Sequence, residues 1–298
     1  MSRLFAFGLG FSAQALAARL ARQGWGIAGT ARDAAKAGQL KARGYAAVRF
    51  AGEPGNQELV TELQGATHLL HSIPPGPGGD PVLAHYRDDL AKLGSLQWIG
   101  YLSTVGVYGD QQGQWCDEDT APTPNSARTE ARVAAEQAWL AFGTETGVPV
   151  QVFRLAGIYG PGRSVFDKLR AGTARRINKD GQVFSRIHVE DIASVLEASI
   201  ARPRAGAIYN VADDEPAAPG DVVAHAAKMI GMTPPPEVEF AEADLTPMAR
   251  SFYEGSRRIG NQLIKSELGV TLRYPTYREG LASLFPEHQS QARLKEKL

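Results

Sequence analysis

The sequence is poor in cysteine, in net charge and in long hydrophobic runs. Among its 298 residues Cys116 is the single cysteine, which excludes an internal disulfide framework and a zinc site made of cysteines alone. The 32 Lys and Arg balance the 32 Asp and Glu, so no nucleic-acid partner is expected, because nucleic-acid-binding proteins usually carry a basic excess. No run approaches the roughly 20 apolar residues that a membrane-spanning helix needs, so no membrane partner is expected either.

The N-terminal segment resembles a short secretory signal in some respects. Arg3 precedes an apolar run at residues 4–11, and Ala13 and Ala15 are spaced like a cleavage site. The run is short, contains two glycines, and continues directly into a helical pattern. Together with the scarcity of cysteine, this favours a cytoplasmic protein over a secreted one.

Short apolar segments alternate with amphipathic ones through the first 200 residues. The expected strands span residues 4–7, 26–30, 46–50, 68–73, 98–103, 150–155 and 207–211, and the expected helices span 13–23, 34–43, 57–64, 83–93, 127–143 and 189–201. Apolar strands separated by helices are typical of a parallel sheet covered on both faces. We therefore expect an α/β fold with a doubly wound Rossmann sheet of about seven strands.

The pattern changes near residue 213, beyond which prolines punctuate short helices and irregular segments. We predict a dinucleotide-binding domain made of residues 1–157 and 183–212. A smaller α+β substrate-binding subdomain would comprise residues 158–182 and 213–298. Residues 158–182 are assigned to it because they lie between two strand units and carry loop residues.

The turn after the first expected strand predicts a dinucleotide site. Residues 8–13 read GLGFSA, in which Gly8 permits a tight turn and Gly10 lets the backbone approach a pyrophosphate. Ala13 permits close packing of helix on strand, while Phe11 and Ser12 start the helix whose N–H groups would face the phosphates. The alternative is an ordinary strand–helix turn.

The end of the second expected strand indicates which dinucleotide is bound. NAD-binding proteins usually place Asp or Glu there, about 20 residues after the glycine turn, to bind the ribose 2′-OH. This chain has Arg32, which can pair with a 2′-phosphate, and Thr30, which can add a hydroxyl group. NADP(H) is therefore the expected cofactor. Asp33 keeps NAD open as an alternative, and Arg32 could instead be a solvated surface charge.

Four further segments carry a family resemblance. Residues 102–109 (LSTVGVYG), 154–162 (RLAGIYGPG), 186–193 (RIHVEDIA) and 209–211 (YNV) resemble, in this order, segments of the extended short-chain dehydrogenases/reductases, which include the NAD-dependent epimerases and dehydratases. The resemblance extends over nearly the whole chain. It implies a nicotinamide cofactor and a substrate cleft between the sheet and the C-terminal part.

In that family a Ser or Thr, a Tyr and a Lys carry the chemistry. Thr104 falls on the Ser/Thr position, which implies that it holds a substrate oxygen. The Tyr and Lys of the family's Y-x-x-x-K motif would fall on Arg128 and Arg132, counted back from the Ala-Glu pair at residues 135–136. No tyrosine lies between Tyr108 and Tyr159, so the chain resembles an atypical branch that lacks the Tyr/Lys pair.

This departure limits what the resemblance implies. An arginine keeps its proton at neutral pH, so Arg128 cannot replace a phenol as a proton shuttle. Arg132 would keep a positive charge near the cofactor ribose. Two guanidinium groups four residues apart share a helix face and could bind a phosphate or carboxylate, which makes Arg128 a candidate substrate ligand. Glu118, Tyr108 or water would then carry the proton, although Glu118 also fits a solvated acidic loop.

Other site residues are expected from their position in the family. Backbone contact with the cofactor is expected from Ser72, Ile73, Pro74 and Gly157, and contact with an anionic substrate from Tyr159, Arg163 and Arg257. Arg257 could equally form a plain surface pair with Arg258. His188 and Asp191 are expected to anchor a helix, with no metal site predicted, while His68 and His71 are expected to pack in the core.

Two functions stay open on the sequence alone. Thr104 and the full substrate subdomain favour an NADP(H)-dependent oxidoreductase or epimerase acting on a polar, anionic small molecule with non-standard acid/base chemistry. Arginine at both family positions favours a non-catalytic NAD(P)(H)-binding sensor or regulator, and a cofactor-free scaffold is a third alternative. Many family members form homodimers through the helix that here carries Arg128, but its residues Val133, Gln137 and Leu140 could equally pack inside the monomer.

Overall fold

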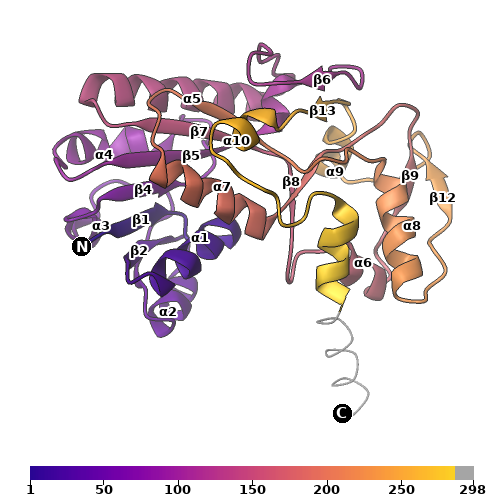
Figure 1. Cartoon of the computed structure of the whole chain (residues 1–298), viewed down its shortest axis with the longest axis horizontal. Coiled ribbons are helices and arrows are strands. Elements are labelled where there is room, and N and C mark those ends of the chain that lie inside the picture. Colours follow the sequence, from indigo (N-terminus) through magenta and orange to yellow (C-terminus); the bar gives the residue numbers. More distant parts are fainter. Residues whose placement is uncertain (286–298) are drawn as a thin grey trace.

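The computed structural model describes residues 1–285, which form a parallel sheet flanked by helices and a set of smaller elements (Figure 1). The sheet order is β3-β2-β1-β4-β5-β7-β11, and every neighbouring pair is parallel. The expected seven-stranded Rossmann sheet is confirmed. Its strands are β1 (Arg3–Phe7), β2 (Gly26–Ala31), β3 (Ala46–Arg49), β4 (His68–His71), β5 (Trp98–Thr104), β7 (Val150–Leu155) and β11 (Ile208–Val211).

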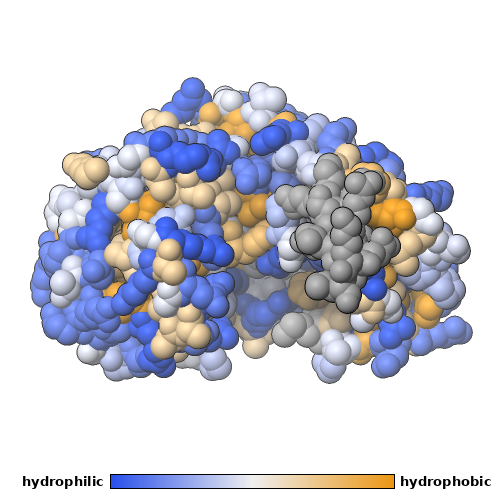
Figure 2. All heavy atoms as spheres, turned by 90° about the horizontal axis from the view of Figure 1, so that it is seen from below, coloured by the Kyte–Doolittle hydropathy of each residue, from blue (hydrophilic) through white to orange (hydrophobic). Residues whose placement is uncertain are grey.

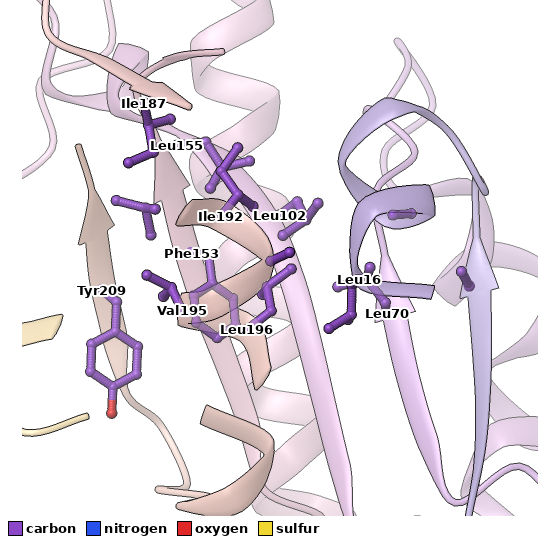
Figure 3. Packing of buried hydrophobic residues seen from close by; sticks show 14 of the residues in the cluster. Leu16, Leu70, Leu102, Phe153, Leu155, Ile187, Ile192, Val195, Leu196 and Tyr209 are labelled. Carbon is purple, nitrogen blue, oxygen red and sulfur yellow. The ribbon is translucent and has the colours of Figure 1, made fainter. Parts of the chain in front are cut away.

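Six helices cover the two faces of the sheet, three on each. On one face lie α1 (Phe11–Arg22), α2 (Ala34–Ala42) and α7 (Val189–Ala201); on the other lie α3 (Gln57–Leu63), α4 (Pro81–Ala91) and α5 (Ala127–Thr146). Side chains alternate along each strand, so that Leu4 and Ala6 of β1 join the first face while Phe5 and Phe7 join the second. Figure 3 shows Ile192 and Leu196 of α7 packed toward the strand residues Leu102, Phe153 and Leu155.

Side-chain caps at their N-termini explain where most of these helices begin. Asp33 caps α2, Asn56 caps α3, Asp80 caps α4, Ser126 caps α5 and His188 caps α7, each side chain accepting from a backbone N–H in the first turn. Among these six helices α1 differs, because it begins after Gly10 with no side-chain cap and no acidic residue in its first turn. Its first backbone N–H groups are therefore left free to donate hydrogen bonds to another partner.

The smaller elements contribute three short parallel pairs: β8 with β10, β9 with β12, and β6 with β13. They are η1 (Val105–Tyr108), β6 (Trp115–Cys116), β8 (Gly157–Tyr159), α6 (Val165–Arg170), β9 (Arg176–Asn178), β10 (Arg186–His188), α8 (Pro219–Met229), β12 (Glu237–Glu239), α9 (Pro247–Ser251), β13 (Arg258–Ile259) and α10 (Gln262–Ser266). Residues 277–285 are also helical.

A separate apolar cluster holds part of the C-terminal region together. Phe166 of α6, Val222 of α8, and Tyr277 and Leu281 of the 277–285 helix belong to it. Ile264 of α10 instead packs in the cluster on the sheet, so the predicted division into domain and subdomain stays a prediction. Residues 286–298, which that subdomain includes, lie outside the described residues.

Within residues 1–285 no helix is long and apolar enough to cross a membrane. Seen from below, hydrophilic and hydrophobic residues are mixed, and the surface is hollowed near its centre (Figure 2). On α5, Val133 and Leu140 are half-buried against the chain's own apolar clusters, and the homodimer stays a prediction.

Candidate functional site

A cavity of about 630 Å³ opens at the carboxyl ends of β1, β2 and β4. Strand order reverses between β1 and β4, and such a switch point is where open α/β sheets bind ligands. The volume lies within the usual range for a small-molecule site. Among the residues that line it are the predicted cofactor ligands Gly8, Gly10, Thr30, Arg32, Ser72, Ile73 and Pro74.

The glycine turn forms one wall of this cavity. Gly8 has φ +81°, and a Cβ atom there would lie 2.8 Å from Ser72 Oγ and 3.0 Å from Ile73 Cγ1. The Gly8 N–H donates to Thr30 Oγ1 at 2.9 Å, and Ser72 Oγ donates to the Gly8 carbonyl. Thr30 is fully buried, so its hydroxyl positions the turn, a role that the sequence did not predict.

The start of α1 follows the glycine turn, although the predicted ligands Phe11 and Ser12 are not among the residues that line the large cavity. Phe11 and Ser12 supply free N–H groups at the positive end of the helix dipole, where an anion is favoured. The guanidinium of Arg163 lies 5.7 Å from the centroid of the Phe11 ring. The structure therefore places Arg163, predicted in the substrate cleft, over the start of α1. Phe11 also lines a second cavity of about 230 Å³ with Pro161 and Val189.

Cationic side chains gather where β2 leads into α2. Arg32 is exposed, lines the cavity, and makes no hydrogen bond or ion pair within the described chain. Lys36 and His85 line the same cavity, and neither was predicted, although Lys36 lies one helical turn beyond Arg32. Asp33 also lines it, but its Oδ1 accepts the Lys36 N–H at 2.7 Å as the cap of α2. The Asp33 carboxylate is thus engaged through Oδ1, and Lys36 Nζ donates to Gln39 Oε1 at 3.4 Å. The Arg32 guanidinium is the cationic group here that has no partner within residues 1–285.

A buried polar group supports the loop between β4 and α4. His71 Nε2 lies 2.6 Å from Asp80 Oδ2, and Trp139 Nε1 donates to the same oxygen at 3.1 Å. Burial works to raise the pKa of Asp80, but hydrogen bonds from His71, the Leu83 N–H and Trp139 bring that pKa below its ordinary value. His68 and His71 are buried as predicted, and Asp80 is a positioning residue that the sequence did not reveal.

Thr104 lies at the carboxyl end of β5, beside the first turn of α5. Its Oγ1 accepts the N–H of Gly106 at 3.1 Å, which leaves its own O–H proton for a substrate oxygen. A Cβ atom on Gly106 would lie 3.3 Å from Thr104 Oγ1 and 3.5 Å from Thr129 Cγ2. The glycine therefore allows Thr104 and the start of α5 to lie close together.

The two arginines of α5 have different environments. Arg132 Nη1 donates to Tyr101 Oη at 3.1 Å and to the Leu102 carbonyl at 2.8 Å, which ties α5 to β5. Arg128 is exposed, and its guanidinium lies 5.1 Å from the centroid of the Phe252 ring. Within the described residues Arg128 has no hydrogen bond and no ion pair.

A buried polar network lies behind Thr104. Glu136 of α5 forms an ion pair with Arg154 of β7 at 2.8 Å and accepts a hydrogen bond from Ser103 Oγ. Arg154 also donates to Tyr108 Oη at 3.0 Å, and Tyr108 donates to Asn210 Oδ1 at 2.8 Å. Burial raises the pKa of Tyr108. The Tyr108 hydroxyl is thus engaged within the fold, away from any substrate.

Glu118 contacts the edge strand. Its Oε1 accepts the backbone N–H of Asn210 in β11 at 2.8 Å, and burial raises the pKa of its carboxyl group. Glu118 therefore attaches the loop after β6 to the sheet. A role in acid/base chemistry stays a prediction.

The remaining predicted residues lie outside the large cavity. Gly157 begins β8, where a Cβ atom would lie 3.3 Å from the Ser185 carbonyl. Tyr159 is buried, and a Cβ atom on Gly280 would lie 1.8 Å from its hydroxyl oxygen. Arg257 Nη1 donates to the Gly109 carbonyl, and burial lowers the pKa of its guanidinium. It therefore ties the segment before β13 to the loop after η1.

The motif at residues 186–193 anchors the chain as expected. Asp191 accepts the N–H groups of Arg273 at 2.7 Å and of Tyr274 at 3.0 Å, and His188 Nδ1 accepts from Glu190 N at 3.2 Å at the start of α7. In the part of the chain that the structure describes, no group of three or more His, Cys, Asp or Glu is arranged to hold a metal ion.

Comparison with known proteins extends these observations. Residues 89–212 match the model of the NAD dependent epimerase/dehydratase family. A solved structure of a functionally unknown conserved protein from Silicibacter pomeroyi DSS is 52% identical, with a TM-score of 0.89 over 96% of this chain and 99% of that one. Protein YeeZ of Escherichia coli (strain K12) is 28% identical over 92% of this chain and 97% of that protein. A 3-diazoavenalumate denitrifying reductase of Streptomyces sp is 25% identical over 94% and 99%.

Proposed function

Because the chain belongs to the NAD dependent epimerase/dehydratase family, we propose that it is an NADP(H)-dependent oxidoreductase acting on an anionic small molecule. The observation that carries this proposal is the charge at the end of β2. Arg32 lines the cavity with a guanidinium that has no partner within residues 1–285, and Lys36 adds a second cation, whose Nζ has a long 3.4 Å hydrogen bond to Gln39. Asp33, the acid in a position to bind a ribose hydroxyl, is engaged as a helix cap. A 2′-phosphate complements that arrangement, because guanidinium and ammonium groups both bind phosphate oxygens.

The rest of the cavity fits a dinucleotide. Gly8 leaves the space that a Cβ atom would fill beside Ser72 and Ile73, and the uncapped start of α1 offers N–H donors to a pyrophosphate. When bound, the nicotinamide ring supplies or accepts a hydride. Arg163, which stacks on Phe11 at the start of α1, is in a position to add a charge to the pyrophosphate site.

In the substrate half, residues that bind the substrate take the place of the catalytic tyrosine of the family. Thr104 keeps an O–H donor for a substrate oxygen because its own acceptor bond goes to Gly106. Arg128 offers a free guanidinium to an anionic group, and Arg132 holds α5 against β5. Because Tyr108 and Glu118 are hydrogen-bonded within the fold, water is the proton carrier that fits this site best.

The similarity to a protein named as a reductase supports reduction as the reaction type. A second function, binding of NADP(H) without catalysis, is favoured by one observation. The segment from residue 93 to residue 167 contains no lysine, and its two tyrosines after β5, Tyr108 and Tyr159, are both buried. No conventional Tyr/Lys pair is thus available beside Thr104.

A deuterium-transfer screen separates the two functions. NADPH labelled at C4 with deuterium, in its two stereoisomers, is incubated with panels of keto acids, conjugated carboxylates and sugar nucleotides. Transfer of deuterium to one product, lost in Thr104→Ala but retained in the surface variant Glu145→Ala, supports the enzyme. Tight NADPH binding with no transfer in any panel contradicts the oxidoreductase and supports the non-catalytic function.

A further inference from the structure

We infer that the substrate half of this site takes a planar, conjugated carboxylate, with its oxyanion on Arg128 and its plane against Phe252. This inference rests on the proposed function, which it makes more specific by naming the substrate class. The inference is based on the contact between the Arg128 guanidinium on α5 and the exposed ring of Phe252, which follows α9.

The first observation concerns Arg128. It is exposed and belongs to the first turn of α5, which is fixed by a capping box between Ser126 and Thr129. Its guanidinium has no hydrogen bond and no carboxylate partner within the described residues. A guanidinium offers parallel N–H donors that match the two oxygens of a carboxylate. The backbone at Arg128 is therefore held in place by the helix cap, and its guanidinium has a pair of N–H donors that no residue of the described chain uses.

The second observation concerns Phe252. Its side chain is 51% exposed, which makes it one of the few large apolar residues on the surface of residues 1–285. It follows α9, and its ring lies under the Arg128 guanidinium at 5.1 Å. Aromatic and guanidinium planes both stack on flat conjugated groups. A ligand with a flat apolar part and an anionic end complements both residues at once.

The position of the pair points to the reacting part of the substrate. Thr129, the residue after Arg128, lies with Thr104 against Gly106, so the first turn of α5, which carries Arg128, is close to the hydroxyl assigned to the substrate oxygen. Arg132, one turn further along α5, directs one nitrogen to Tyr101 and Leu102 and braces the helix. An anion on Arg128 would thus be held by the turn of α5 that packs beside Thr104.

Ligand binding to the full chain saturated with NADP⁺ tests this inference. The probes are benzoate and trans-cinnamate, their neutral amides, the non-planar cyclohexanecarboxylate, phenyl phosphate and UDP-glucose. Saturation-transfer NMR detects binding, and calorimetry gives the dissociation constants. Both planar carboxylates should bind more tightly than their amides and than the non-planar acid.

Three variants assign the contacts. Arg128→Ala should weaken trans-cinnamate binding about tenfold or more, and Phe252→Ala about threefold. Arg87→Ala is the matched control, because Arg87 lies 5.4 Å over the ring of Phe142 on another part of α5, and it should leave binding unchanged. Arg128 and Phe252 are exposed, so these variants should keep the wild-type melting temperature, which confirms that they fold.

Other outcomes overturn the inference. Equal affinity for cinnamate and cinnamamide, or no effect of Arg128→Ala, would contradict it. Arg128-dependent binding of phenyl phosphate or UDP-glucose without binding of the carboxylates would assign the site to a phosphate. If NADP⁺ binds but no planar carboxylate does at millimolar concentration, this inference fails while the proposed cofactor stands. If NADP⁺ itself does not bind, the proposed function fails first.

Discussion

Two buried carboxyl groups show how the cofactor side of the molecule differs from the C-terminal side. Asp80, below the cofactor cavity, receives hydrogen bonds from Trp139 and two backbone N–H groups and contacts His71 at 2.6 Å. Asp213, beyond β11, is 1% exposed, and its Oδ2 has no hydrogen-bond partner within residues 1–285. Burial raises the pKa of Asp213 to about 8, although the Arg186 guanidinium acts to lower it.

Their neighbours within residues 1–285 include buried polar atoms without a partner on both sides, and His71 Nδ1 is the one beside Asp80. On the C-terminal side the Tyr159 hydroxyl and His188 Nε2 are also buried without a partner within the described chain. Each such group costs about 1–3 kcal/mol of stability. The difference therefore lies in the two carboxylates: both oxygens of Asp80 have partners, whereas one oxygen of Asp213 has none within residues 1–285. We expect substitutions on the cofactor side to change NADPH affinity and those on the C-terminal side to change the pH dependence of stability.

The largest effect is expected where the two sides meet, at the ion pair between Glu136 and Arg154. Glu136→Ala leaves Arg154 charged and buried, which should lower the free energy of unfolding by about 3–5 kcal/mol. Urea unfolding followed by circular dichroism measures it. Glu145→Ala, which removes an exposed pair with Arg87, should cost less than about 1 kcal/mol. Equal losses would show that the buried network contributes no more than a surface pair.

A change in the glycine turn should act on binding. Gly8→Val places methyl groups against Ser72 and Ile73 in a backbone conformation of φ +81°, so NADPH affinity should fall about 100-fold or more, or roughly 2.7 kcal/mol. Gly94→Ala, where a Cβ atom would meet nothing within 4 Å, is the control and should bind normally. Normal NADPH binding by Gly8→Val would place the cofactor elsewhere.

A pH effect should be specific to the C-terminal side. The pKa of Asp213 is about 8 in the folded chain against an ordinary value of 3.8. Its contribution to the free energy of unfolding is therefore fully present below about pH 3.8. That stability is lost as the pH rises toward 8. Asp213→Asn should remove this loss, so that the variant gains about 2 kcal/mol relative to wild type between pH 6 and pH 8. Parallel stability–pH curves for the two proteins would contradict the shift.

The sequence predicted best what local spacing determines. Strand and helix positions and the turn at Gly8 follow from patterns within 30 residues, and all were found where expected. The roles of Asp80 and Phe252 depend on contacts between segments far apart in the chain, namely Trp139 with Asp80 and Phe252 with Arg128. No single segment carries a signal for such contacts. The buried carboxyl of Asp213 likewise depends on how the C-terminal part folds over β11.

The smallest effect gives the most direct test of the cofactor assignment. Calorimetric titration of NADPH and NADH into wild type and Arg32→Ala isolates the 2′-phosphate, because the two nucleotides differ in that group alone. We expect micromolar NADPH binding that weakens about tenfold in Arg32→Ala, roughly 1.4 kcal/mol, with NADH affinity unchanged. Equal affinity of wild type for NADPH and NADH, or no binding of either, would contradict it.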